Sequence, residues 1–416
     1  MADELHILFN TGAYPPARCG GGPIKSVSAL AKKLVQRGCR VTVAAINCDG
    51  DEVLDVPIAR PVRRDGVDVL YFDTARCWWQ GLPLNALQKA SVFRMTDNWH
   101  QWIWQCGGEF DVINSQLGFL ASNPQASLVA KSSSSLYFYH QRGNLDPRRF
   151  GRRAWLKKLF ITLCEQKILK RADALIALSQ READVYRSLR PNARIAHIPN
   201  GVDVEAWRVP AEPSGSLKQD LQRLAAGPMV VWLNRYDSRK GPDIFIDSIH
   251  RARQEGILVN GLMAGPDATG MLPQIQARIH TLGLGDFLIA RSGLEGADLR
   301  AVLHASSIYA LPTSGEGFSM GLLEAMAAGS FVVTTPEANF PELELHHAGL
   351  VVDCSAESFK NAYSHILSKP HFAEATRNNA RALVGEQFNW DAVVDRYLAL
   401  VRELRALRAM KLICDR

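Results

Sequence analysis

The sequence predicts an α/β protein of two domains, each built on a parallel β-sheet. The composition is that of an ordinary globular chain, since 47% of the 416 residues are hydrophobic and 22% are charged. Short apolar runs alternate with helix-length amphipathic segments along the whole chain, as in successive β-α-β units. This alternation pauses after residue 200 and restarts near residue 229, so we expect two domains that face a cleft.

The first domain is expected to begin with a buried strand at residues 5–9. A glycine-rich loop follows, and then a helix over residues 24–37, because Val27, Leu30 and Leu34 recur at helical spacing. Gly38 is a typical signal for the end of that helix. Further strands are expected at residues 41–46, 67–72, 112–114, 136–139, 174–178 and 195–198. Strands of this apolar kind belong to a sheet that helices cover on both faces.

The second domain repeats the pattern after a polar segment that is rich in proline, glycine and serine. Its strands are expected at residues 229–233, 258–264, 287–290, 307–311, 331–334 and 350–352. A final helix is expected at about residues 390–410, since Val393, Tyr397 and Leu400 lie at helical spacing.

Charge and cysteine usage exclude several classes of protein. The formal net charge of +6 is low for a protein whose whole surface binds nucleic acid. No apolar stretch reaches the ~18 residues that a bilayer span needs, and the N-terminus lacks the basic region of a signal peptide. The eight cysteines include no C-x-x-C pair, which favours reduced thiols in a cytoplasmic protein over a disulfide framework or a zinc site.

The strongest local signal for chemistry is segment 314–329, which follows a strand and opens a helix. The first N–H groups of a helix have no partner within it and favour an anion, and Gly317 leaves room for a phosphate there. Glu316 and Glu324 lie eight residues apart, so both can face one ligand and accept hydrogen bonds from sugar or ribose hydroxyls. The alternative is an ordinary helix with one capping and one solvated glutamate.

Two further loops, each after a predicted strand, carry candidate ligand-binding residues. Arg235 and Lys240 follow the strand at 229–233 and would suit the charge of a leaving diphosphate. Gly21 and Gly22 lie in a loop that matches neither the dinucleotide fingerprint nor a P-loop. The main sequence evidence for an enzyme that binds a nicotinamide cofactor is therefore missing. A solvated basic loop and a plain strand-to-helix turn are the respective alternatives.

Together, both halves of the chain resemble the GT-B glycosyltransferases of family 4, the retaining class that uses nucleotide sugars. The resemblance is carried in family order by the glycine-rich loop with residues 30–38, by HIPNGVD at 197–203, by residues 235–241, by Glu316-x7-Glu324 and by NFPE at 339–342. It implies a GT-B fold in which residues 1–200 bind the acceptor and residues 201–392 bind the nucleotide sugar. Residues 393–416 are then the C-terminal helix, which crosses the domain junction back to the N-terminal domain.

The resemblance also implies a role for each candidate residue. Glu324 would accept hydrogen bonds from the ribose and Glu316 from the transferred sugar, while two cations, Arg235 and Lys240, would neutralise the diphosphate. Further donor contacts are implied for Gly21, Gly22, Gly317, Phe318, Ser319, Leu322 and, near the base, Arg291. Such enzymes retain the anomeric configuration and need no essential metal or other cofactor. The metal-binding D-x-D pattern at residues 49–51 is therefore interpreted as a polar turn.

Four residues of the first domain complete the predicted site. His140, after the strand at 136–139, is expected to contact the donor sugar, although a lone histidine there is often structural. Arg142 matches a family subgroup with His or Arg before a glycine and is a candidate acceptor contact. Trp78 and Trp79 belong to a cluster of five tryptophans that would suit acceptor stacking, with helix packing as the alternative. Asn114 stands where the family often has a histidine, which weakens an acceptor role at that strand.

We therefore expect a cytoplasmic hexosyltransferase that moves a sugar from a nucleoside diphosphate to a saccharide acceptor. Assembly of cell-surface polysaccharide, lipopolysaccharide or another lipid-linked glycan is the expected setting, and no nucleic acid partner is expected. A sugar-nucleotide epimerase of the same fold and a catalytically inactive nucleotide- or glycan-binding scaffold are the rival interpretations.

The surplus positive charge is concentrated in one segment. Residues 146–171 contain nine basic and two acidic side chains, a net charge of +7, so the rest of the chain is nearly neutral. The segment is also amphipathic, with Trp155, Leu159 and Leu163 among its apolar residues. One interpretation is a solvated helix face that covers the sheet. The other is peripheral contact of residues 148–171 with an anionic membrane, at its inner face.

Overall fold

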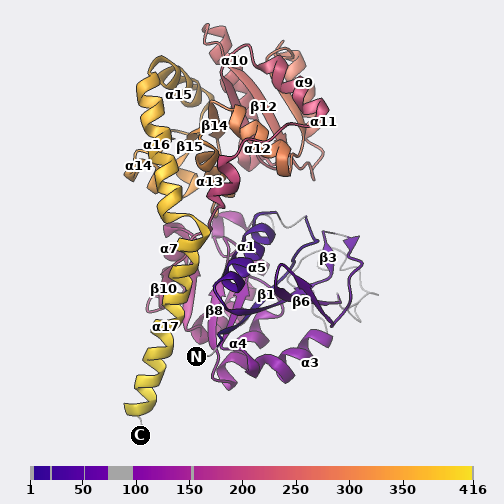
Figure 1. Ribbon diagram of the computed structural model, residues 1–416, viewed down its shortest axis with the longest axis vertical. Coiled ribbons are helices and arrows are strands. Elements are labelled where there is room, and N and C mark those ends of the chain that lie inside the picture. Colours follow the sequence, from indigo (N-terminus) through magenta and orange to yellow (C-terminus); the bar gives the residue numbers. More distant parts are fainter. Residues whose placement is uncertain (1–3, 19–20, 51, 74–96, 151–153, 415–416) are drawn as a thin grey trace. The chain divides into compact units, whose positions relative to one another are not determined.

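The computed structural model describes residues 4–18, 21–50, 52–73, 97–150 and 154–414, which form two compact units (Figure 1). The first unit comprises residues 1–200 together with 390–416, and the second comprises residues 201–389. The chain therefore leaves the first unit after Asn200 and returns to it at Trp390.

The first unit contains an eight-stranded sheet in the order β10-β9-β8-β7-β1-β2-β6-β5. Its strands are β1 (His6–Thr11), β2 (Arg40–Ile46), β5 (Pro61–Arg64), β6 (Val67–Phe72), β7 (Val112–Gln116), β8 (Leu136–His140), β9 (Ala174–Ala177) and β10 (Ile195–His197). All neighbours pair in parallel except β5 and β6, which are antiparallel. A separate small hairpin joins β3 (Cys48–Asp49) to β4 (Glu52–Val53).

Helices cover both faces of this sheet because alternate strand residues point to opposite sides. The helices are α1 (Gly22–Gln36), α3 (Asp97–Cys106), α4 (Asn123–Ser132), α5 (Ala154–Phe160), α6 (Gln166–Arg171), α7 (Gln180–Leu189) and α17 (Trp390–Cys414). On one face, Ile7 and Phe9 pack in a core with α1 and α17. On the other face, Leu8 packs in a core with α3, α4, α6 and α7.

The second unit contains a six-stranded, wholly parallel sheet in the order β13-β12-β11-β14-β15-β16. Its strands are β11 (Met229–Leu233), β12 (Asn260–Gly265), β13 (Leu288–Ser292), β14 (Ile308–Leu311), β15 (Phe331–Thr334) and β16 (Leu350–Val351). Its helices are α8 (Val204–Arg208), α9 (Gly215–Leu224), α10 (Pro242–Gln254), α11 (Leu272–Thr281), α12 (Gly296–Ala305), α13 (Met320–Ala328), α14 (Glu342–Leu345), α15 (Ala356–Ser368) and α16 (Pro370–Gln387). One core lies under α10, α11 and α15, and the other lies under α9, α12, α13 and α16.

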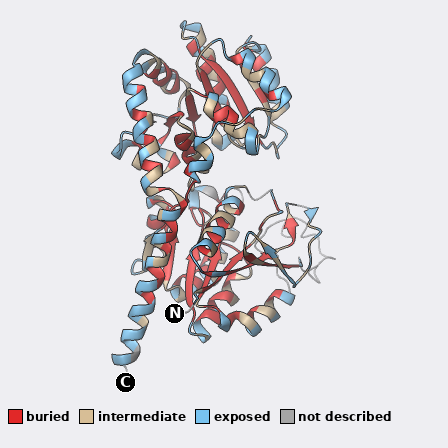
Figure 2. Ribbon diagram, viewed as in Figure 1, coloured by how far each residue is buried: buried red, intermediate tan, exposed pale blue. Residues whose placement is uncertain are grey.

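The predicted fold class is confirmed, since each unit is a parallel α/β sheet whose strands are buried between helices (Figure 2). The C-terminal helix α17 packs on α1 of the first unit, where Lys33 pairs with Asp391 and Arg37 with Asp395. The antiparallel edge strand β5 and the small β3–β4 hairpin were not predicted, because short polar strands show little hydrophobic pattern. Among the described residues, no helix is long and apolar enough to cross a bilayer.

Candidate functional site

In the second unit, the loops that follow β11 and β14 pack directly against each other. The two strands are neighbours in the sheet, so their carboxyl ends emerge side by side. Gly241, which has a φ of +63°, lies where a Cβ atom would come within 2.0 Å of the Pro312 carbonyl oxygen. The Ser314 N–H and the Thr313 hydroxyl both donate to the Arg239 carbonyl, at 2.8 and 3.1 Å. This close approach requires glycine at position 241 and fixes one loop on the other.

The packed loops bring Lys240 and Glu316 together in an ion pair. The Lys240 and Glu316 side chains are 15% and 9% exposed, so the pair is largely shielded but still reaches the surface. The backbone around Glu316 is fixed as well, because its N–H donates to the Glu337 carbonyl at 2.9 Å. The Asn339 side-chain amide donates to the Glu316 carbonyl at 2.6 Å. Two of the predicted site residues are therefore in direct contact.

The start of α13 presents the predicted anion-binding amides next to this pair. Ser319 caps the helix, and its hydroxyl accepts a hydrogen bond from the Leu322 N–H at 3.4 Å. The Leu322 side chain is buried in the core, so any donor contact at this residue falls to its backbone. The Phe318 ring packs edge-on against Phe340, with centroids 5.6 Å apart, and anchors the loop. Glu324 is partly buried within α13, in the second turn of the helix, and Glu316 lies in the loop before the helix.

Tyr309, which belongs to no motif of the sequence, lies beneath the start of α13. Its ring is fully buried in β14, and its hydroxyl lies 3.5 Å from the Leu233 carbonyl. A Cβ atom at Gly321 would lie 2.4 Å from this hydroxyl, so glycine allows α13 to sit directly on it. Burial raises the pKa of Tyr309, and the charges of Glu316 and Glu324 raise it further. The hydroxyl is thus neutral near pH 7. The one sequence signal for this residue is that it is the single tyrosine in an otherwise aliphatic strand.

The other basic residues near this site differ in how they are held. Arg239 is bound to Asp237, with 2.6 Å between Nη2 and Oδ2, and this hydrogen bonding lowers the pKa of Asp237 to about 2. Arg235 is exposed and makes no ion pair with any residue that the structure describes. Arg291 pairs with Asp220 of α9 at 2.7 Å, and its carbonyl accepts a hydrogen bond from the Tyr236 hydroxyl. The predicted cations are Arg235, Lys240 and Arg291. Lys240 and Arg291 each pair with a carboxylate, so Arg235 is the one of the three without a carboxylate partner among the described residues.

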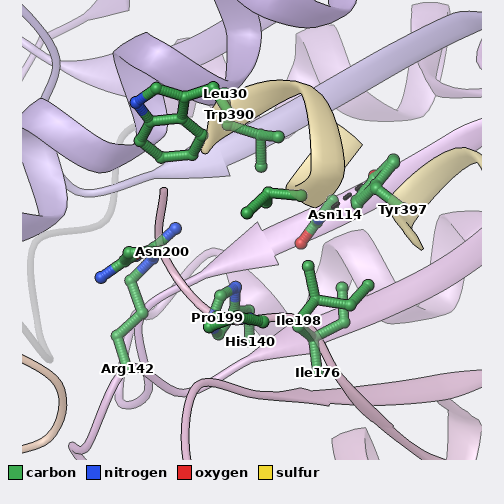
Figure 3. A pocket seen from close by; sticks show the side chains of 11 residues that line it. Leu30, Asn114, His140, Arg142, Ile176, Ile198, Pro199, Asn200, Trp390 and Tyr397 are labelled. Atoms are coloured by element: carbon green, nitrogen blue, oxygen red, sulfur yellow. Dashed lines mark hydrogen bonds between the residues drawn. The ribbon is translucent and has the colours of Figure 1, made fainter. Parts of the chain in front are cut away.

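In the first unit, the end of β8 forms one wall of a small pocket (Figure 3). The pocket is lined by Leu30, Asn114, His140, Arg142, Ile176, Ile198, Pro199, Asn200, Trp390, Val393 and Tyr397. His140 is only 3% exposed, and its Nε2 atom has no hydrogen-bond partner among the described residues. Burial holds the pKa of His140 well below its usual value, and the charge of Arg142 acts in the same direction. The imidazole is therefore neutral near pH 7.

Arg142 is buried within the same pocket and is held by neutral side chains. Its Nε atom donates to the side-chain Oε1 of Gln116 at 2.7 Å, and Nη1 donates to the side chains of Ser26 at 2.8 Å and Asn200 at 3.1 Å. Burial lowers the pKa of Arg142 to about 10, which leaves it charged near neutral pH. These hydrogen bonds link α1, β7 and Asn200, the last residue before the chain leaves the first unit. Asn114 in turn donates to the Tyr397 hydroxyl of α17 at 3.1 Å.

The remaining predicted residues of the first unit are only partly described. Gly21, with a φ of +58°, caps α1, and Gly22 is its first residue. Among the described residues, apart from the chain neighbours, no atom lies within 4 Å of a Cβ built on either glycine. Trp78, Trp79 and Asp51 lie outside the described residues. Within the described part of the chain, no group of three or more His, Cys, Asp or Glu side chains is arranged to hold a metal ion.

Comparison with known proteins assigns a family model to each half of the chain. The model "Glycosyltransferase Family 4" matches residues 20–206, and the model "Glycosyl transferases group 1" matches residues 216–383. The chain is 28% identical over 264 residues to alpha-maltose-1-phosphate synthase of Mycobacterium tuberculosis, a match covering 59% of this chain and 67% of that protein. It is 28% identical over 249 residues to D-inositol 3-phosphate glycosyltransferase of Gordonia bronchialis, covering 56% of this chain and 53% of that protein. The matches thus span about half to two thirds of these relatives.

Solved structures show the fold over nearly the whole chain. The crystal structure of Anabaena Alr3699/HepE in complex with UDP has a TM-score of 0.71 at 18% identity, covering 96% of this chain and 100% of that one. Sucrose-phosphate synthase from Thermosynechococcus elongatus has a TM-score of 0.72 at 20% identity, covering 97% of this chain and 100% of that one. At this level of identity the likeness concerns the fold, which is GT-B.

Proposed function

Since the chain belongs to the GT-B glycosyltransferase superfamily, we propose that it moves a hexose-type sugar from a nucleoside diphosphate to a saccharide acceptor. The observation that carries this proposal is the Lys240–Glu316 ion pair at the start of α13. It places a cation, a carboxylate and the amides of a helix N-terminus in one small region. A sugar nucleotide needs all three, because its diphosphate is anionic and its sugar and ribose carry hydroxyl donors.

The site's charges suggest how the donor is held. The diphosphate approaches the first amides of α13 and takes Lys240 as its counter-ion, with Arg235 as a second cation. Glu316, released from Lys240, then accepts hydrogen bonds from hydroxyls of the transferred sugar, while Glu324 accepts them from the ribose. As the bond to the anomeric carbon breaks, negative charge grows on the diphosphate, and fixed cations and amides stabilise that charge. The residues thus act by positioning and by electrostatic stabilisation.

The remaining features of the proposal come from the resemblance to family 4. The anomeric configuration is retained, and the residues above do the work without a metal. His140, neutral and buried, contacts the donor sugar through hydrogen bonds and does not act as a charged acid near pH 7. UDP in the Anabaena structure supports a nucleoside diphosphate as the donor's leaving group. The names of the two curated relatives support testing phosphorylated sugars and cyclitols among the acceptors.

A lipid-linked glycan at the inner face of a membrane is the acceptor that we propose for the cell. The segment 148–171 would then hold this cytoplasmic enzyme next to its acceptor. The support for this part is the concentration of basic and apolar side chains in that segment.

Thermal stabilisation by a panel of nucleoside diphosphate sugars tests the donor site, followed by transfer assays with the donors that bind. Glu316→Ala and Arg235→Ala should each reduce transfer by about 100-fold or more, the range typical of lost transition-state contacts. Arg239→Ala is the matched control, because this neighbouring cation is already neutralised by Asp237.

Three results would contradict the proposed function. Full activity in Glu316→Ala would remove the ion pair from the mechanism. Conversion of the sugar nucleotide to its epimer without an acceptor would identify an epimerase. Donor binding without turnover on any acceptor would favour a binding scaffold.

A further inference from the structure

The helical segment from α5 to α6 has two apolar faces. One face packs on the protein, where the Phe160 ring lies 5.7 Å from the Phe119 ring and Ile161, Ile168 and Leu169 are buried. The other face is open, with Trp155 65% exposed, Leu159 49% exposed and Leu163 55% exposed. These three side chains recur every four residues, which places them in one row along the helix. The sequence pattern predicts one apolar face for this segment, whereas the structure divides the apolar residues between two faces.

The charge on the open face has one sign. Lys158, Lys167 and Lys170 are exposed along the same segment. Glu165, the only acidic residue among residues 154–171, is fully buried in the π turn η5 (Ile161–Glu165). Its carboxyl oxygens accept hydrogen bonds from the Phe119 N–H at 2.8 Å and from the Tyr139 hydroxyl at 2.5 Å, so this acidic group lies inside the protein and not on the open face.

We refer to this surface as the Trp155 face; it comprises Trp155, Lys158, Leu159, Leu163, Lys167 and Lys170. Lys157 is not part of it, because its Nζ lies over the rings of Phe119 and Phe150, at 5.6 and 5.3 Å from their centroids. Leu258 and Leu345 of the second unit are also strongly exposed but lie far apart in the sequence, and Leu407, Met410 and Ile413 form a separate exposed row near the end of α17. A row of one tryptophan and two leucines flanked by three lysines is a concentrated apolar and cationic surface.

The chemistry of the face selects one kind of partner. Tryptophan and leucine favour the boundary between lipid headgroups and acyl chains, and lysines next to them are attracted to anionic headgroups. A second copy of the chain, docked face to face, would bring lysines against lysines, which is unfavourable. An anionic bilayer complements both the apolar row and the lysines.

We propose that the Trp155 face docks on an anionic lipid bilayer, with Trp155, Leu159 and Leu163 at the headgroup boundary and the three lysines on lipid phosphates. This deepens the membrane contact of the proposed function by naming the side chains that make it. It does not depend on the transfer reaction, because lipid binding is measured without donor or acceptor.

Sedimentation of the full chain with vesicles tests the docking surface. The protein should sediment with phosphatidylcholine vesicles that contain phosphatidylglycerol, should not sediment with pure phosphatidylcholine, and should be released by salt. The double variant Trp155→Ser with Leu159→Ser should lower the vesicle partition coefficient by about 10-fold or more, given the apolar area that each side chain buries. Lys158→Ser with Lys167→Ser should weaken binding to the anionic vesicles and reduce its dependence on salt.

The matched control is Leu258→Ser with Leu345→Ser, which removes two leucines of the second unit that are at least as exposed as Trp155 and Leu159. Equal binding by the wild type, the Trp155 double variant and this control would overturn the proposal. If the wild type sediments without vesicles and the Trp155 double variant does not, the face mediates self-association, and this result would also overturn the proposal.

Transfer to a short water-soluble acceptor, measured on the same proteins, distinguishes a failure of this proposal from a failure of the proposed enzyme function. Loss of vesicle binding with intact transfer is expected for the Trp155 variant, whereas a wild type that binds vesicles but transfers nothing refutes only the enzyme function.

Discussion

Two buried ionisable groups of the first unit, Arg142 and Glu165, have neutral partners, whereas two lysines of the second unit, Lys240 and Lys360, are held by carboxylates. In the first unit, Arg142 is bound by the neutral side chains of Gln116, Ser26 and Asn200, and Glu165 is bound by a phenol and a backbone N–H. In the second unit, Lys240 pairs with Glu316, and Lys360 pairs with both Glu255 and Glu357. An isolated buried charge with neutral partners is costly to disturb, whereas an ion pair near the surface can exchange one partner for a ligand.

This difference suggests a division of work between the units. The neutral partners of Arg142 fix α1, β7 and Asn200 relative to one another, so this cation belongs to the framework of the first unit. The Lys240–Glu316 pair lies on two loops at strand ends, and both of its charges match groups of a sugar nucleotide. We therefore expect the second unit to neutralise the charge of the diphosphate. We expect the first unit to supply a pocket whose shape is fixed by the hydrogen bonds of Arg142.

The largest effect is expected for Lys240→Met, which removes the cation from the pair at little cost in volume. Transfer should fall by about 100- to 1000-fold, because a fixed positive charge next to the leaving diphosphate is lost. Steady-state kinetics with the identified donor measures this change.

Lys360→Met is the matched control for Lys240→Met, since it breaks an ion pair of the same unit at a lysine whose side chain is 7% exposed. It should lower stability without a comparable loss of turnover. An equal loss of turnover in both variants would mean that Lys240 acts only through folding.

For Arg142→Met we expect a loss of stability of about 2–4 kcal/mol, because three buried acceptors lose their donor. Urea unfolding followed by circular dichroism measures this change. Transfer per folded molecule should stay within a few-fold of the wild type. If stability were unchanged and the acceptor KM rose instead, Arg142 would be an acceptor contact, and the contrast between the units would fail.

Glu165 provides a prediction about pH. Burial raises its pKa from 4.5 to about 7, so between these values the native chain keeps a proton that the unfolded chain has lost. The free energy of unfolding should therefore fall as the pH rises from about 4.5 to about 7 and should level off above, by about 1.4 kcal/mol for each unit of pKa difference.

The variant Glu165→Gln should remove this pH dependence, which is measured as the difference between its unfolding free energies and those of the wild type. Asp184→Asn, at an exposed carboxylate of α7, is the control and should leave the slope unchanged. A slope of opposite sign in the wild-type difference curve would show that Glu165 is ionised in the native state below pH 5.

The smallest effect is expected for Tyr309→Phe, which removes one hydroxyl beneath the start of α13. The donor KM should rise about five-fold, the equivalent of one hydrogen bond, while the acceptor KM should not change. Tyr363→Phe is the control, because it removes an equally buried hydroxyl of the same unit, 3.1 Å from Ser248 and outside the candidate site. Equal changes of donor KM in the two variants would assign Tyr309 to the core alone.

Much of the fold could be predicted from local pattern. The strands β6, β11 and β15 begin and end at the expected residues, and β2 begins one residue earlier than expected, because buried parallel strands are short apolar runs bounded by loops. The last helix begins at Trp390 as expected and continues to Cys414, beyond the predicted end. The edge strand β5 was missed, since half of its residues are exposed and its pattern is polar.

The candidate site could be predicted only in part. Lys240 and Glu316 were selected separately, each from its own loop, but their ion pair joins residues 76 positions apart. Tyr309 was not selected at all, because its importance lies in the Gly321 backbone that rests on its hydroxyl. The Trp155 face was expected as an amphipathic helix, yet which apolar residues remain exposed depends on what Phe160 and Ile168 pack against.

The sequence by itself determined the alternation of strands and helices, the two α/β domains and the residue types that can bind a sugar nucleotide. These follow from hydrophobic periodicity and from glycines and charges at strand ends, which are local properties. The tertiary structure decided which charges are paired, which polar groups are buried and which apolar side chains remain on the surface. The order of strands in a sheet brings distant loops together, and burial then sets the energy of each charge; neither is encoded within a single segment.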